Sequence, residues 1–195
     1  LDVCDVTINN LTIESADVCV QIYGRRVRIS NCLMKAGRYC IWAGAQTPVE
    51  DIVVIKCVCE SQGAESTLRF THAKRVEIIE CDLSNGMKHC FRVHGTSSNI
   101  LLQDVKMRGT GNGIGMFSFI ATMPTDINNV TLQRVVIQCT GPDLFNIPRD
   151  GIAVQNLLAD DVRLDLPQTA WDPLVSLLRS IPPTWTLTNV RSVRV

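Results

Sequence analysis

Apolar residues recur along the chain in short alternating runs, and the same run returns at intervals of about two dozen residues. Eight segments align so that their first, third and sixth positions are apolar while the second is mostly polar or charged. Alternation with a period of two is typical of a β-strand that turns one face to the core. The segments are residues 6–13, 27–34, 52–59, 76–83, 100–107, 130–137, 152–159 and 185–192.

The alternation changes phase inside each segment, because two residues separate the inward third position from the inward sixth position. The fifth position is Asn10, Asn31, Asn156 or Asn189 in four of the eight segments. Asparagine tolerates left-handed backbone angles, which a sharp bend requires. Each segment therefore predicts two short strands that meet at a bend of about two residues.

A third short strand precedes seven of the segments, with apolar residues flanking a mostly polar middle residue. These strands are residues 20–22, 41–43, 68–70, 91–93, 117–119, 145–147 and 175–177. Three strands in a coil of about 24 residues cannot bury their own apolar face, so successive coils must stack on one another. The pattern predicts an all-β fold, a right-handed parallel β-helix of about seven to eight coils that forms a single domain over residues 1–195. A leucine-rich repeat would need helical periodicity, and a propeller would need hairpin turns; neither fits the chain as well.

The nine cysteines find places in this scheme. Cys32, Cys57 and Cys81 occupy the same inward position in successive segments, and Cys59 lies two positions further on. Cβ atoms that stack in neighbouring parallel strands lie somewhat too far apart for a disulfide. No pair has the CxxC spacing of a zinc site. We expect a ladder of reduced, buried thiols, which is typical of folding in a reducing cytosol, and we expect no metal and no cofactor.

The net charge is zero, since 19 Lys and Arg balance 19 Asp and Glu. This balance argues against general affinity for nucleic acid or anionic membranes, and no run of 18 apolar residues predicts a membrane span. The first segment starts a coil in its middle, which would leave an exposed sheet edge. We therefore expect that an N-terminal part is lacking or that another chain caps this end.

The repeat resembles that of the pectin-lyase-like β-helix superfamily, over essentially the whole chain. Members include pectate lyases, polygalacturonases, alginate lyases and the tailspike or virion surface proteins of bacteriophages. In the enzymes the substrate groove follows the outer face of the first strand of each coil, so the resemblance directs attention to the outward residues there. One outward column is Gln21, Trp42, Arg69, Arg92, Ser118, Asn146 and Ser176, and the other is Tyr23, Gly44, Thr71, His94, Ile120, Pro148 and Leu178.

These columns supply the candidate site residues. Aromatic and Arg side chains suit a sugar face and the carboxylate of an acidic sugar. The ligand-binding candidates are Gln21, Tyr23, Trp42, Arg69, Arg92 and His94. A lyase needs a cation beside the uronate carboxylate and a base for the C5 proton, for which Arg92, His94 and Lys88 are the catalytic candidates. Lys88 and His89 would lie on the loop that leads into this strand, and His72 is expected to point inward.

The leading hypothesis is a non-enzymatic structural or adhesion module. The clustered Asp residues of the family's hydrolases and the paired Asp calcium ligands of its pectate lyases are not found on the outward columns. The resemblance implies a virion surface component, such as a capsid decoration protein or part of a tailspike or fibre, that folds in the host cytoplasm. It also implies a homo-oligomer, specifically a trimer, or another virion protein as partner, and a possible polysaccharide ligand. The alternative is a secreted polysaccharide lyase, or related carbohydrate-active enzyme, acting on uronate polymers at the first-strand face.

Overall fold

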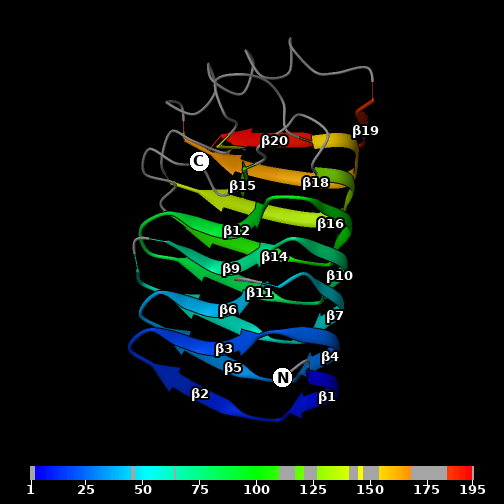
Figure 1. The fold of residues 1–195 in the computed structure, drawn as a ribbon. Coiled ribbons are helices and arrows are strands. Elements are labelled where there is room, and N and C mark those ends of the chain that lie inside the picture. The colour runs from blue at the N-terminus through cyan, green and yellow to red at the C-terminus, as the bar shows by residue number, and fades with distance from the viewer. Residues whose placement is uncertain are drawn as a thin grey trace.

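The computed structural model describes residues 3–44, 47–63, 65–109, 117–120, 127–140, 145–146, 154–167 and 184–194. Over these residues the chain winds into a solenoid of parallel strands, in which each coil stacks on the one before it (Figure 1). The all-β, parallel β-helical fold expected from the repeat is confirmed. No helix that could span a membrane occurs in this part of the chain.

Two strand lines form the larger sheet, called sheet A. Within sheet A every strand pairs in parallel with its counterpart in the next coil. The first line contains β1 (Val3–Asn9), β4 (Gly24–Ser30), β7 (Val49–Ile55), β10 (Ala73–Ile79), β13 (Ser97–Gln103), the first halves of β16 (Ile127–Cys139) and β18 (Val154–Leu166), and β19 (Thr186–Thr188). The second line contains β2 (Thr12–Ser15), β5 (Leu33–Ala36), β8 (Val58–Ser61), β11 (Asp82–Asn85), β14 (Lys106–Gly109), the second halves of β16 and β18, and β20 (Arg191–Arg194).

The third strand of each coil belongs to a separate sheet, called sheet B. Sheet B contains β3 (Val18–Ile22), β6 (Tyr39–Ala43), β9 (Ser66–Thr71), β12 (His89–His94), β15 (Phe117–Ile120) and β17 (Phe145–Asn146). Its six described strands correspond to about six turns, slightly fewer than the expected seven to eight. The expected third strand at residues 175–177 lies outside the described residues.

Seven of the eight sequence segments stack in the expected register, from the pair Val6 and Val27 to the pair Ile100 and Val130. The alignment of the seventh segment is wrong by five residues, because Val130 pairs with Leu157 and not with Ile152. Val154 is an inward residue of the same strand, and it pairs with Ile127 one bend earlier. The apolar residues on both sides of that bend made the two registers look alike in the sequence.

The bends are formed by residues with left-handed backbone angles. The expected asparagines Asn10, Asn31 and Asn189 occupy the bend inside the segment, with φ of 55°, 53° and 54°. Asn156 is left-handed too, but it belongs to a second bend just before the segment, which the sequence did not reveal. Charged residues also adopt this conformation at the bends, at a cost that the stacked coil must offset. The two bends carry, in coil order, Asp5, Arg26, Asp51, Arg75, Asn99, Asn129 and Asn156, and then Asn10, Asn31, Lys56, Glu80, Asp104, Arg134, Asp161 and Asn189.

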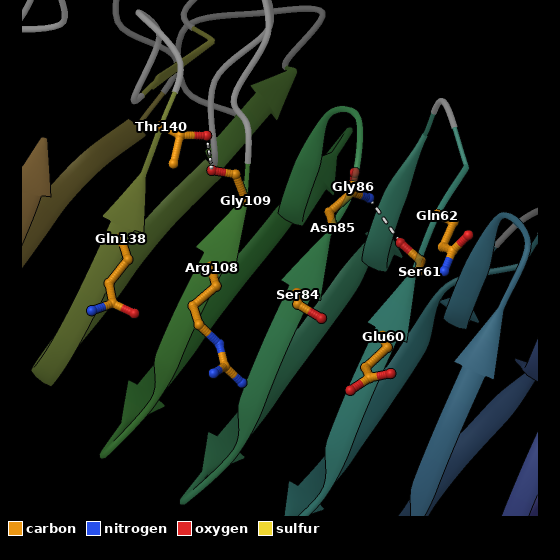
Figure 2. Close-up of a pocket in the computed structure, with 10 residues that line it drawn as sticks. All are labelled: Glu60, Ser61, Gln62, Ser84, Asn85, Gly86, Arg108, Gly109, Gln138 and Thr140. Atoms are coloured by element: carbon orange, nitrogen blue, oxygen red, sulfur yellow. Dashed lines mark hydrogen bonds between the residues drawn. The ribbon is translucent and has the colours of Figure 1, made fainter. Parts of the chain in front are cut away.

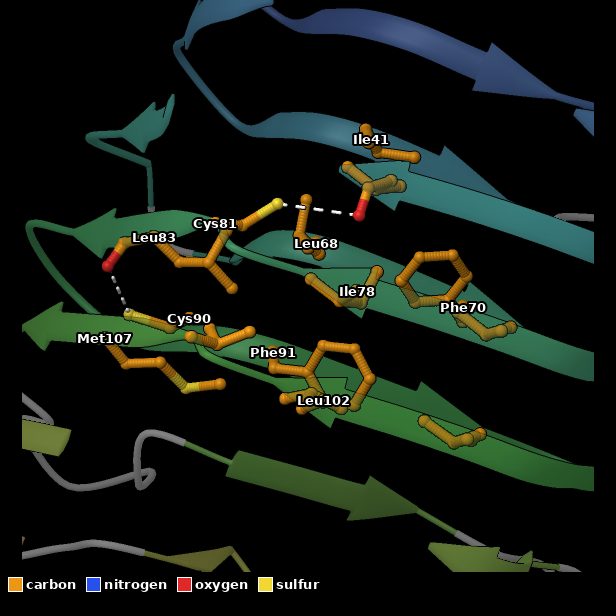
Figure 3. Close-up of a cluster of buried hydrophobic side chains, with 14 of the residues drawn as sticks. Ile41, Leu68, Phe70, Ile78, Cys81, Leu83, Cys90, Phe91, Leu102 and Met107 are labelled. Atoms are coloured by element: carbon orange, nitrogen blue, oxygen red, sulfur yellow. Dashed lines mark hydrogen bonds between the residues drawn. The ribbon is translucent and has the colours of Figure 1, made fainter. Parts of the chain in front are cut away.

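Inward side chains fill one continuous core along the solenoid (Figure 3). Phe70 of β9 and Phe91 of β12 are fully buried, and their ring centroids lie 5.7 Å apart in a tilted arrangement. Such aromatic pairs add to the stabilisation that burial of their area provides. Because the same rungs support both sheets, the outward faces rest on a shared rigid core.

The cysteines behave as the repeat predicts. All nine are free, and Cys32, Cys57 and Cys81 are buried. Their thiols donate to strand carbonyls, as Cys32 does to Ser30 at 3.1 Å and Cys81 to Ile79 at 3.2 Å. Burial raises the pKa of the half-buried Cys19 to about 11, which keeps this thiol protonated. The expected ladder of reduced thiols is therefore present in the structure.

Candidate functional site

The outer face of sheet B carries the predicted columns of outward residues in register. Gln21 pairs with Trp42, Trp42 with Arg69, and Arg69 with Arg92. In the second column, Thr71 pairs with His94. The columns continue on the backbones of β15 and β17, while the expected members Pro148, Ser176 and Leu178 lie outside the described residues.

Aromatic rings and guanidinium groups interleave on this face. The Arg69 guanidinium lies 5.4 Å from the centre of the Trp42 ring and 5.8 Å from that of Tyr39. Its Nη1 donates a hydrogen bond of 2.9 Å to the Tyr39 hydroxyl. The guanidinium of Arg38 also contacts this aromatic pair and lies 5.1 Å from the centre of the Tyr39 ring. These contacts hold Arg69 in position, and no carboxylate among the described residues contacts its guanidinium.

Arg92 is held differently, since its Nη1 donates to Glu65 at 2.8 Å. Its side chain is only 17% exposed. Burial and the neighbouring Arg69 lower the pKa of Arg92 from its usual value, against the opposing effect of Glu65. Two cations therefore lie on adjacent strands and Glu65 pairs with only one of them, so the local charge is positive although the chain as a whole is neutral.

His94 lies next to the arginines at the end of β12. Burial lowers the pKa of His94, and the charges of Arg69, Arg92 and His72 lower it further. A cationic neighbourhood favours the neutral imidazole, so His94 can accept or donate a hydrogen bond near neutral pH. Its Nδ1 is buried and has no hydrogen-bond partner within the described part of the chain.

Unpartnered polar atoms are concentrated on this face. Buried side-chain atoms without a hydrogen-bond partner are few among the described residues, and five of them belong to outward residues of sheet B. Each such atom costs about 1–3 kcal/mol when nothing satisfies it. They are Trp42 Nε1, Arg69 Nε, Thr71 Oγ1, Arg92 Nε and His94 Nδ1.

The remaining sequence candidates lie at the margins of this cluster. Gln21 is exposed on β3, and Tyr23 follows it with 40% of its surface exposed. Lys88 lies in the turn before β12, where its backbone N–H donates to Asn85. His89 begins β12 and is buried, so it is not a loop residue as expected.

The expectation that His72 points inward is wrong. His72 is exposed at the corner after β9 and has a φ of 50°. The left-handed backbone turns its side chain away from the core, which simple alternation could not predict. Its Nδ1 accepts a hydrogen bond of 3.2 Å from the backbone N–H of Thr96.

Sequence reasoning missed Tyr39 and Glu65. Tyr39 begins β6 two residues before the inward Ile41, so alternation places it inside, yet its ring contacts the outward Trp42 with centroids 5.4 Å apart. Cys40, which follows it, points into the core, so the alternation is broken at this corner. Glu65 lies in the turn that leads into β9, where no periodic pattern exists to mark it.

No group of three or more His, Cys, Asp or Glu side chains in the described ranges is arranged to hold a metal ion. The face thus offers cations, aromatic rings and hydrogen-bond donors as its binding chemistry.

The sequence matches none of the family models against which it was scanned, and a search of curated proteins found no similar sequence.

Proposed function

We propose that the chain is a non-enzymatic adhesion module that binds an acidic glycan on the outer face of sheet B. The observation that carries this proposal is a pair of arginines on adjacent strands, one of which is held by aromatic rings and a tyrosine hydroxyl. A bound carboxylate would supply the anionic partner that Arg69 lacks among the described residues. Arg69, which has no carboxylate contact in the described structure, is the cation available to the ligand.

The aromatic residues favour a sugar as the body of this ligand. Trp42 presents an indole ring beside Arg69, and such a combination binds the apolar face of a sugar together with its carboxylate. Consecutive strands lie about 4.8 Å apart, so neighbouring units of a uronate chain would meet Arg69 and Arg92 in turn.

The biological setting of the module is also a proposal. The parallel solenoid resembles the pectin-lyase-like superfamily, whose phage members are tailspikes and other virion surface proteins. A virion surface component that forms a trimer or contacts another virion protein is the setting which that resemblance favours.

A second candidate function is favoured by one specific observation. The lowered pKa of His94 leaves a neutral imidazole beside Arg92, and this combination can remove the C5 proton of a uronate while a cation neutralises its carboxylate. The candidate is therefore a polysaccharide lyase that acts at the same face. It shares the ligand with the adhesion module and differs in turnover.

Titration calorimetry with oligogalacturonate and oligoguluronate tests whether the face binds an acidic glycan, as both functions require. Removing the unpaired cation by Arg69→Ala should weaken binding at least about tenfold, or 1.4 kcal/mol. The matched control is Arg28→Ala, because Arg28 is an exposed arginine on β4 in sheet A.

Ultraviolet absorbance of unsaturated products reports lyase activity in the same samples. For an adhesion module we expect binding with no increase in absorbance. An increase that His94→Gln abolishes would replace the adhesion proposal by the lyase. Absence of binding to both oligomers, or equal losses in Arg69→Ala and Arg28→Ala, would reject the proposed site for acidic glycans on sheet B.

A further inference from the structure

A long groove follows the carboxyl ends of the second strand line of sheet A, where the turns that lead into sheet B begin. Two adjoining open depressions of about 640 and 620 Å³ form it, and both are lined by Glu60 and Gln62. The groove crosses β2, β5, β8, β11, β14 and β16 at their carboxyl ends, and Figure 2 shows the part that lies over β8, β11, β14 and β16. Six strands spaced by about 4.8 Å give it a length of about 24 Å.

One outward residue of each strand lines the groove, and these residues pair in register from coil to coil. In contrast to sheet B, the column mixes both charges with neutral hydrogen-bonding groups. No aromatic residue is among the described residues that line the two depressions. The column reads Glu14, Lys35, Glu60, Ser84, Arg108 and Gln138.

Neighbouring side chains hold two polar groups of the column, both at the end of the groove nearer β16. Arg108 donates to Asp82 at 2.7 Å, and Gln138 donates to Asp165 at 3.2 Å. Beneath them the buried Asn85 donates to Ser61 at 2.8 Å, and its Oδ1 accepts from the backbone N–H of Met87. Ordered side chains lose little entropy when a ligand binds, so the part of the groove over β11, β14 and β16 is organised in advance for hydrogen bonding.

We propose that this groove binds a linear, uncharged oligosaccharide that lies along the solenoid axis. Carboxylate, amide, hydroxyl and guanidinium groups alternate along it, and a chain of sugar hydroxyls can both donate to and accept from such a series. The ligand advances by roughly one sugar ring for each strand that it crosses. This proposal does not depend on the proposed site for acidic glycans on sheet B.

The charges of the groove select against acidic chains. Glu14 and Glu60 lie in the column on either side of Lys35, and Arg108 is already paired with Asp82. A uronate polymer would therefore meet carboxylates and no available pair of cations. Without an aromatic platform each sugar contributes modestly, so affinity should rise with the number of rings.

The test uses cello-, malto-, xylo- and mannohexaose, with oligogalacturonate of the same length for comparison, and measures binding by calorimetry and by shifts in amide NMR signals. Ser84→Trp fills the middle of the groove from an outward position on β11. Thr7→Trp places the same side chain on the exposed outer face of β1 and serves as the matched control.

We expect at least one neutral hexasaccharide to bind, to shift signals of β8, β11 and β14, and to bind at least about tenfold more weakly to Ser84→Trp than to Thr7→Trp. Arg69→Ala should leave this binding unchanged. Failure of all four neutral hexasaccharides to bind would overturn the proposal, as would binding that survives Ser84→Trp. The effect of Arg69→Ala on uronate binding tests the proposed function of sheet B and does not test the groove.

Discussion

The outer face of sheet B and the groove over sheet A are built on the same coils, yet they differ in how far neighbouring side chains satisfy their polar atoms. On sheet B, buried polar atoms of Trp42, Arg69 and His94 have no hydrogen-bond partner. In the groove, Arg108 and Gln138 are held by carboxylates. Both faces rest on a sheet whose backbone hydrogen bonds run between coils. The difference therefore comes from the outward side chains alone, which can change without altering the fold.

The largest expected effect tests whether the two faces share one core. Phe70→Ala should destabilise the protein by about 3–5 kcal/mol, because it leaves a cavity beside Phe91 between fully buried rungs. Urea unfolding followed by tryptophan fluorescence and by circular dichroism should show one transition at a lower midpoint. Met87→Ala, at a side chain that is 51% exposed, should change stability by no more than about 0.5 kcal/mol. Separate transitions for the two probes would show that the faces do not unfold together.

A pair of glycine substitutions compares the two faces at an intermediate magnitude. Gly44 follows β6 with a φ of +78°, and an added Cβ would lie 1.8 Å from the Thr71 carbonyl oxygen. Gly44→Ala should therefore cost about 2 kcal/mol or more. Gly86 lines the groove, and an added Cβ there would meet nothing closer than 3.7 Å. Gly86→Ala should be neutral or slightly stabilising in the same unfolding assay. Equal costs at the two positions would contradict this account of the corners.

The smallest expected effect concerns pH and only sheet B. Because the pKa of His94 is lowered in the folded chain, the unfolded chain binds more protons once the pH falls below the ordinary value of 6.5. Stability should decrease as the pH falls from that value toward the folded pKa, and His94→Gln should flatten this dependence of Tm. Solvent screening keeps the effect small. NMR titration of the His94 ring checks the cause directly, and a midpoint at or above 6.5 would refute it.

The repeat in the sequence was sufficient to predict most of the fold. Inward positions such as Val27, Ile52 and Val76 stack as expected, because burial on one face leaves a strict alternation in the sequence. The seventh coil was displaced because Val154 and Leu157 lie on opposite sides of a bend and are both inward. Bends formed by charged residues such as Arg26 and Lys56 gave no sequence signal, since their left-handed angles are imposed by the stacked coils.

The candidate site was predictable in part for the same reason. Trp42, Arg69, Arg92 and His94 were identified because outward positions of regular strands follow from alternation. Tyr39 was missed at an irregular corner, and Glu65 was missed in a turn. The groove over sheet A was missed because it has no distinctive residue type and exists only when six coils are stacked.

The corner ladder of Asp5, Arg26, Asp51 and Arg75 constrains how the coils can stack. Arg26 bonds to Asp5, and Arg75 bonds to Asp51, each through both carboxylate oxygens. If the second coil were skipped during folding, Asp5 would lie against Asp51. If the third coil were skipped, Arg26 would lie against Arg75. Most inward residues at these corners are similar in kind, such as Val27, Ile52 and Val76, so the charges add a distinction that the core makes less sharply. Skipping a coil would thus bring like charges together. The alternating charges therefore favour the native coil order over a shortened or domain-swapped product.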